Sequence, residues 1–222
     1  MRSIAGLCVV WLTVVLLGCG RPTLVVGFGA TDQRLTETIV LNERRTGGAK
    51  VALIDVSGVL ANAERRSLIG AAPNPVSSFT EALNKAASDE DVEAVVLRIN
   101  SPGGTVTASD VMYRELTRFR ERTDKPAVAV MMDLATSGGY YLACAADTVV
   151  AHPTTITGSV GVILQTVSVE PALSRIGVEA RAFTSGGNKN AGSPLSTLTD
   201  EQAATLQALV DGFYDRFVAV VR

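Results

Sequence analysis

Short apolar runs, separated by glycine, proline and polar residues, dominate the chain after residue 49. Runs of this length and composition are typical of strands buried in a sheet. We expect strands at residues 50–58, 94–99, 126–132, 148–152 and 178–183, with a further turn and strand within 158–168. Residues 61–75 lack such a pattern and are predicted to form a loop.

Helical periodicity occupies most of the stretches between these runs. Helices are predicted at residues 76–87, 106–122 and 170–177, and in a last stretch that begins after Thr199. Thr199 and Gln202 have the spacing of a capping box. The apolar face of the first helix comprises Val76, Phe79, Leu83 and Ala86, and that of the last comprises Leu206, Leu209, Val210, Phe213 and Phe217.

The alternation of buried strands with helices predicts the fold class. It indicates an α/β fold with a largely parallel sheet. The chain has 222 residues, 47% of them hydrophobic, which is enough for a single domain with a sizeable core. In such sheets the chemistry gathers in the loops after the carboxyl ends of the strands. The stretches "NSPGG" (100–104) and "LATSGG" (134–139) lie in loops of this kind.

The first residues have the features of an export signal. Residues 4–17 carry no charge and follow Arg2, but a membrane-spanning helix needs about 20 apolar residues. The stretch "LLGC" that ends at Cys19 resembles the lipobox of bacterial lipoproteins. We therefore expect residues 1–18 to be a signal peptide and Cys19 to carry a lipid that anchors the exported protein to a bacterial membrane. The alternative is an ordinary signal peptide with an incidental cysteine.

The rest of the chain is predicted to comprise a linker and one domain. Residues 19–49 form the linker, with a short strand expected at 23–28, and residues 50–222 form the domain. The formal net charge is -2 without a run of like charges, so we expect no nucleic-acid partner. Cys144 would be the one cysteine left in the domain, which excludes an intrachain disulfide there. Its small apolar neighbours favour a buried, inert thiol.

Ser137 is the candidate nucleophile. It stands in "ATSGGYYLACAAD" (135–147), between an apolar strand and an apolar helix, where backbone N–H groups point outward. It could be a plain helix cap, but the two glycines that follow allow a ligand to approach the backbone closely. Gly103 and Gly104 of "SPGG" could donate N–H groups to an oxyanion, although Pro-Gly is also common at turns.

A serine nucleophile needs a base, and the residues leave two routes open. His152 is the one imidazole of the chain, so a Ser-His-Asp triad would depend on it alone. The other route is a neutral lysine. Lys189 lies in the glycine-rich loop 184–194, whereas Lys50, Lys85 and Lys125 are predicted to face solvent. Spacing alone does not decide between these routes.

Taken together, five segments resemble the signal peptide peptidase A family of serine proteases. They occur in the order "KVALIDVSGVL", "VVLRINSPGGTVTASD", "DLATSGGYYLACAAD", "TGSVGVI" and "TSGGNKNAGSP". The resemblance extends over most of residues 50–222. It implies a ClpP/crotonase-like fold of stacked ββα units.

The resemblance also implies roles for individual residues. Ser137 would be the nucleophile, Lys189 the general base, and Gly103 and Gly104 the oxyanion hole. Ser159 would orient the lysine. No metal or cofactor is expected. The substrates would be extended apolar peptides, such as signal-peptide remnants at the membrane. The family further implies a homo-oligomeric ring or dome, in which Lys189 of one subunit serves Ser137 of the next.

The sequence departs from the family at both ends. "LLGC" indicates a lipid where relatives usually have a membrane-spanning helix. The chain ends at Arg222, before a further helix and a "DGR-x-[YF]-x-G-x-x-A" segment, so we expect a fragment or a loss of C-terminal packing. Two alternatives to a peptidase therefore stay open: a catalytically silent lipoprotein that binds peptides or scaffolds an assembly, and a crotonase-like acyl-CoA enzyme that uses the backbone donors alone.

Overall fold

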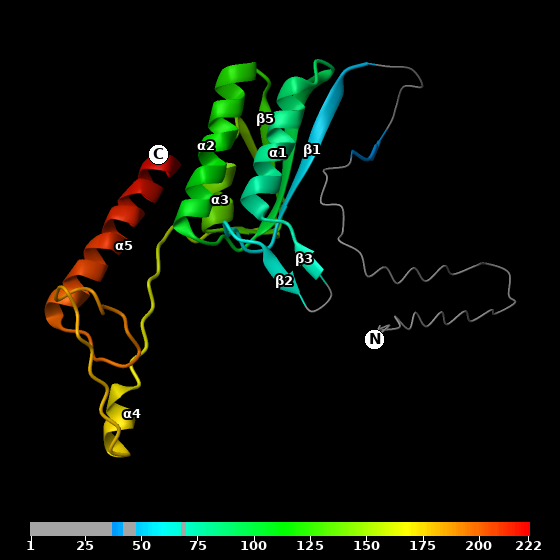
Figure 1. Cartoon of the computed structure of the whole chain (residues 1–222). Helices are drawn as coiled ribbons and strands as arrows, with labels where there is room; N and C mark the ends of the chain where they lie inside the picture. Colours follow the sequence, from blue (N-terminus) through cyan, green and yellow to red (C-terminus); the bar gives the residue numbers. More distant parts are fainter. Residues whose placement is uncertain (1–36, 42–47, 68–69) are drawn as a thin grey trace, which may run out of the picture. The chain divides into compact units, whose positions relative to one another are not determined.

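The computed structural model describes residues 37–41, 48–67 and 70–222 (Figure 1). The predicted signal peptide at 1–18, the lipidation site Cys19 and the short strand expected at 23–28 lie outside the described residues. The described residues belong to one compact unit. Among them, no helix is long and apolar enough to cross a membrane.

A parallel sheet forms the centre of the fold, which confirms the predicted α/β class. Its main strands, in spatial order, are β1(Lys50–Ser57), β4(Val92–Ser101), β5(Ala127–Thr136) and β6(Thr148–Ala151). β5 is longer than predicted and pairs with two strands in turn, first with β6 and then with β7(Ile156–Gly158). The last pair joins Thr136 to Gly158, so the end of β5 is held in place immediately before Ser137.

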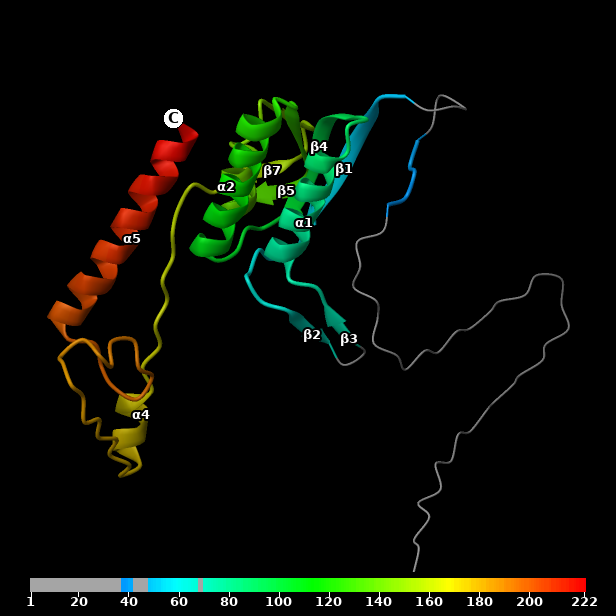
Figure 2. The same cartoon turned by 45° about the horizontal axis from the view of Figure 1, so that its top comes forward.

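Two helices cover one face of this sheet. α1(Pro75–Ser88) and α2(Val106–Thr123) lie side by side against β1, β4 and β5, as Figures 1 and 2 show. The predicted face of α1 is buried, and α2 buries Ala108, Met112, Leu116 and Phe119. These side chains pack on alternate strand residues, namely Ile54, Val56, Val95, Leu97, Ile99, Ala127, Ala129 and Met131. The strand–helix units therefore repeat side by side along the sheet.

The opposite face of the sheet is not covered by the described residues. Val51 is 61% exposed and Leu53 is 40% exposed, and Met132 is exposed as well. Among the described residues, the burial predicted for these strands is therefore confirmed on one face of the sheet only. Strand positions that face solvent are mostly polar, whereas these strands are apolar on both faces. Their composition is therefore explained if another surface covers this face.

Three predicted elements differ from the structure. The loop expected at 61–75 contains an antiparallel hairpin of β2(Arg65–Ser67) and β3(Gly70–Ala72). The strands expected within 158–168 and at 178–183 are absent, apart from Gly158 at the end of β7. The chain leaves the sheet after β7, and an apolar run forms a strand only where a neighbouring strand satisfies its backbone. Ile163 and Phe183 in these segments are 86% and 96% exposed.

Residues 159–221 form what we call the arm. It comprises an extended stretch, α4(Glu170–Arg175), a long loop and α5(Asp200–Val221). The capping box predicted at the start of α5 is confirmed by hydrogen bonds in both directions between Thr199 and Gln202. The predicted apolar face of α5 is mostly uncovered, because Phe217 is buried whereas Leu209 and Phe213 are 49% and 42% exposed.

Candidate active site

Ser137 occupies a sharp turn between β5 and α3(Gly138–Ala143). Its backbone has φ 51° and ψ −120°, a conformation that non-glycine residues rarely adopt. Its N–H donates to the carbonyl of Gly158 at 2.8 Å, and its carbonyl accepts from the N–H of Tyr141 at 2.8 Å. Its side chain makes no capping hydrogen bond, so Ser137 is not a side-chain N-cap. A strained serine whose hydroxyl does not serve its own helix is typical of a functional site.

Gly103 and Gly104 allow the "SPGG" loop to pack closely on its neighbours, and Gly103 touches this turn. Gly103 has φ +92°, and a Cβ on it would lie 2.5 Å from the nitrogen of Gly138 and 2.9 Å from the Cβ of Ser137. A Cβ on Gly104 would lie 1.8 Å from the carbonyl oxygen of Leu60. Because β4 and β5 are parallel, their carboxyl ends bring "SPGG" and the Ser137 turn together, as the sequence predicts.

The backbone donors near Ser137 differ in availability. The N–H of Gly103, which the sequence assigned to the oxyanion hole, donates instead to Oγ of Ser101 at 3.0 Å, and that hydroxyl donates to the carbonyl of Gly58 at 2.6 Å. The N–H of Gly103 is therefore not free for an oxyanion in this structure. Gly104 and Gly138 both line a small cavity beside Ser137. The N–H of Gly138 is the first of α3 and has no acceptor within its helix. Sequence reasoning missed Gly138, although its place directly after the serine and at a helix start is the signal that could have identified it.

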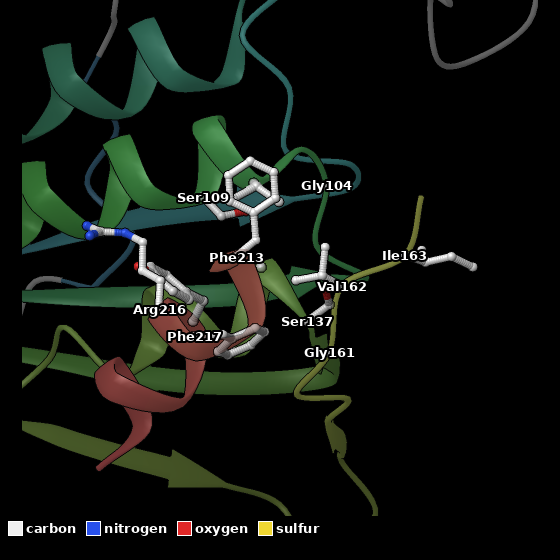
Figure 3. A pocket seen from close by; sticks show the side chains of 12 residues that line it. Gly104, Ser109, Ser137, Gly161, Val162, Ile163, Phe213, Arg216 and Phe217 are labelled. Carbon is white, nitrogen blue, oxygen red and sulfur yellow. The ribbon is translucent and has the colours of Figure 1, made fainter. Parts of the chain in front are cut away.

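The cavity has mostly apolar walls that come from distant parts of the chain (Figure 3). It has a volume of about 110 Å³. One wall is formed by the start of the arm, with Gly161, Val162 and Ile163, and another by the end of α5, with Phe213, Arg216 and Phe217. Figure 3 shows Val162 and Phe217 close to Ser137, whereas the side chain of Ile163 points away from it.

Lys189 does not lie beside Ser137 of its own chain. It is exposed in the loop between α4 and α5, and it does not line the cavity. Gln202 fastens this loop to the first turn of α5, donating from Nε2 to the carbonyl of Gly187 at 2.7 Å and to Oδ1 of Asn190 at 3.0 Å. Phe217, at the cavity, is about 15 residues further along the same helix, which corresponds to about 22 Å at 1.5 Å per residue.

The other lysines lie at the amino ends of the strands, opposite the Ser137 edge. Lys50 pairs with Asp89 at 2.9 Å, and Lys85 pairs with Glu37 at 3.2 Å. Lys125 is half-buried, so the prediction that it faces solvent is wrong. Its Nζ donates to the carbonyls of Ala86 at 2.9 Å and Asp89 at 2.8 Å, where it caps the end of α1.

His152 does not form a triad with Ser137 among the described residues. It is exposed after β6, and its Nδ1 lies 2.8 Å from Oγ1 of Thr154. The register of β6 on β5 places Ala151 beside Met131, well before the Ser137 turn.

Ser159 is closer to that turn, because it follows Gly158, whose carbonyl accepts from the N–H of Ser137. Ser159 is exposed and has φ 54°.

Cys144 follows α3 and is half-buried rather than fully buried. Burial raises the pKa of its thiol, which disfavours the reactive thiolate and agrees with the predicted inert role. Within the described part of the chain, no group of three or more His, Cys, Asp or Glu side chains is placed to hold a metal ion.

Comparison with known proteins extends the resemblance noted in the sequence. Residues 120–222, which include Ser137 and Lys189, match peptidase family S49. The chain is 31% identical over 194 residues to a putative signal peptide peptidase SppA of Enterococcus faecium, covering 87% of this chain and 55% of that protein. It is 33% identical over 174 residues to Protease 4 of Haemophilus influenzae, covering 78% and 27%. The chain is therefore SppA-like, and its residues 120–222 match peptidase family S49.

The chain spans about half of the first relative and about a quarter of the second. Among solved structures, the 1510-N membrane-bound stomatin-specific protease, as a variant, aligns with 55% of this chain and 52% of its own, at 14% identity and a TM-score of 0.41.

Proposed function

We propose that this chain is a serine peptidase in which Ser137 is the nucleophile. The observation that carries the proposal is the strained backbone of Ser137, which leaves its hydroxyl out of the capping of α3 and beside a cavity. The glycine backbone of the "SPGG" loop packs against the same turn. A rigid nucleophile next to fixed backbone donors is the arrangement that acyl transfer requires.

The base is Lys189 of a neighbouring copy, as the resemblance implies. Two observations support a shared site. Along α5, the Lys189 loop held by Gln202 lies about 16 Å from Phe213, the first α5 residue at the cavity, and about 22 Å from Phe217. The arm also exposes large apolar side chains. Ile163, Ile176 and Phe183 are 86%, 73% and 96% exposed. Surfaces of this kind mark sites of protein association. The assembly would be a homo-oligomeric ring or dome.

The reaction would proceed through an acyl-enzyme. Neutral Lys189 removes the proton of the Ser137 hydroxyl as its oxygen attacks a peptide carbonyl. The backbone N–H groups of Gly104 and Gly138 donate to the oxyanion of the tetrahedral intermediate. The lysine then returns the proton to the leaving amine, and a water molecule hydrolyses the ester, which restores Ser137. Ser159 would orient the lysine.

The substrates would be extended apolar peptides cut after small or apolar residues. The cavity beside Ser137 supports this, since Val106, Val162, Phe213 and Phe217 give it apolar walls. A lipid on Cys19 would hold the exported protein at the membrane, where signal-peptide remnants occur.

Labelling with a serine-directed fluorophosphonate tests the proposal. The wild-type chain should be labelled once, at Ser137, and should cleave an internally quenched apolar peptide. Ser137→Ala should abolish both, and Lys189→Ala should abolish cleavage while the fold survives. If Lys189→Ala cleaves at a near-normal rate, another group is the base.

A catalytically silent scaffold is the second candidate. The uncovered sheet face and the exposed arm favour association with other chains, and a silent scaffold would associate in the same way. It would take up no fluorophosphonate at Ser137, even after assembly.

A further inference from the structure

A group of polar side chains joins α5 to the helix that follows Ser137. Arg216 of α5 donates two hydrogen bonds to Oδ1 of Asp110 on α2, from Nε at 2.9 Å and from Nη2 at 2.6 Å. Tyr141 of α3 donates its hydroxyl hydrogen to the same oxygen at 2.8 Å. We call Asp110, Tyr141 and Arg216 the clasp. Tyr141 is one helical turn after Ser137, so the clasp connects α5 directly to the turn that holds the nucleophile.

Aromatic packing and burial strengthen this connection. The ring of Tyr141 meets the ring of Phe217 edge to face, with centroids 5.1 Å apart. Burial, together with the hydrogen bond to Asp110, raises the pKa of Tyr141 to about 12, so its hydroxyl stays a donor at neutral pH. Burial alone would raise the pKa of Asp110, but the hydrogen bonds from Arg216, Tyr141 and Arg114 lower it below its usual value. All the charges of the clasp therefore persist at neutral pH.

The other end of α5 holds the loop that carries Lys189. Gln202 is 5% exposed and binds Gly187 and Asn190 on either side of the lysine. α5 is a single helix from Asp200 to Val221, so its two ends keep a fixed distance. Apart from the start of the arm, which leaves the sheet at Gly158, the end of α5 with the clasp and Phe217 is the main attachment of the arm to the core.

We propose that the clasp is a positioning device for the dyad: by holding the end of α5 against α3, it sets where the arm presents Lys189 to the neighbouring copy. This inference rests on the proposed function, because it requires the lysine to act on the serine of another chain. Asp110 and Arg216 are positioning residues, which act through α5. In the chain that supplies the serine, the same clasp fixes one wall of the cavity.

Mixed particles separate these two effects. Ser137→Ala chains can supply only the lysine, and Lys189→Ala chains can supply only the serine, so their co-assembly should restore part of the activity. Arg216→Ala is then added to one chain type at a time, and kcat and KM are measured with an internally quenched apolar peptide. On the lysine-supplying chain it should lower kcat about tenfold to a hundredfold, with KM little changed, because small misplacements of a catalytic group have effects of this size. On the serine-supplying chain it should mainly raise KM.

Arg114→Ala provides a matched control. Arg114 donates to Oδ2 of the same Asp110 at 2.9 Å, but it lies four residues further along α2, is 57% exposed and does not line the cavity. Its loss removes a positive charge from the same carboxylate without releasing α5, so activity should stay within about twofold, as for other surface ion pairs. Arg216→Lys keeps the charge but loses the two-nitrogen contact, and it should restore part of kcat.

Several outcomes would overturn the inference. One is an unchanged kcat when Arg216→Ala is on the lysine-supplying chain. Another is that Arg216→Ala changes kcat and KM equally whether it is on the lysine-supplying or the serine-supplying chain, which would indicate a purely structural role. If Arg216→Ala prevents assembly in sedimentation experiments, Tyr141→Phe, which removes one clasp hydrogen bond and keeps the ring, takes its place with the same expectations. If the mixed particles without any clasp change are inactive while the wild type is active, the shared dyad itself is refuted, and the inference with it.

Discussion

Gly103 and Ser137 are packed so closely that a methyl group on Gly103 would lie 2.9 Å from the Cβ of Ser137. The backbone of Gly103 also has φ +92°, which an alanine rarely adopts. The conformation of the serine turn therefore depends on a residue 34 positions earlier in the chain. This contact belongs to the site, and it can be tested without knowledge of the substrate.

Gly103→Ala should lower the free energy of unfolding by about 1–3 kcal/mol and abolish fluorophosphonate labelling, because the turn must shift to make room. Urea unfolding and labelling measure the two effects. Gly212→Ala on α5 is the control, since a Cβ there meets nothing within 4 Å. It should be neutral or stabilise the chain by up to about 1 kcal/mol, as expected for glycine to alanine within a helix. Equal labelling of both variants would contradict the proposed role of Gly103.

Lys125→Met should destabilise the fold by about 1 kcal/mol without changing the site. The Nζ of Lys125 donates to carbonyls at the end of α1, and hydrogen bonds from charged groups contribute more than neutral ones. Denaturant unfolding of the full chain measures this change. Lys85→Met, which breaks an exposed pair with Glu37, should cost less than about 0.5 kcal/mol. A larger effect at Lys85 than at Lys125 would show that the capping role is wrong.

The stability of the chain should fall at acidic pH, in part through Asp147. Its carboxylate accepts from the N–H of Ala127 at 2.8 Å and from Nε of Arg120 at 2.9 Å, and these bonds hold its pKa below the usual value. A lowered pKa gives stability that is present above the unfolded value, about 3.9, and is lost as the pH falls through the folded value.

Urea unfolding from pH 6 down to pH 2 measures this loss. Asp147→Asn should give a flatter curve of stability against pH. Asp133→Asn should keep the slope of the wild type, because the carboxylate of Asp133 forms no hydrogen bond or ion pair with the described residues. Identical slopes for wild type and Asp147→Asn would contradict the assignment.

Phe217→Ala should detach α5 from the core while leaving the rest of the chain folded. Phe217 is the buried apolar side chain of α5 and packs on Tyr141, whereas the rest of the helix is largely exposed. Hydrogen exchange should speed up in α5 and at the cavity, while β4 and β5 keep their protection. Leu209→Ala, at a position 49% exposed on the same helix, should leave both regions unchanged. Faster exchange throughout the sheet would show that α5 is part of the global fold.

Much of the fold could be predicted from the sequence because it depends on local signals. The buried faces of α1 and α2, the capping box of α5 and the strands of the parallel sheet all follow from periodicity and capping chemistry. The prediction of strands within 158–168 and at 178–183 was wrong, because the apolar composition of a segment does not reveal whether a partner strand lies beside it. The half-buried state of Lys125 also depends on a contact with α1, which is distant in sequence.

The sequence by itself determined which residues carry the candidate chemistry. "TSGG", "SPGG" and the lysine loop are short motifs, and their residue types limit what each can do. Only the tertiary structure decided how they relate to one another. Parallel pairing of β4 and β5 brings Gly103 to Ser137, whereas α5, anchored by Arg216 at one end and by Gln202 at the other, keeps Lys189 away from its own serine. Such distances are set by the lengths and packing of whole elements, which no local pattern encodes.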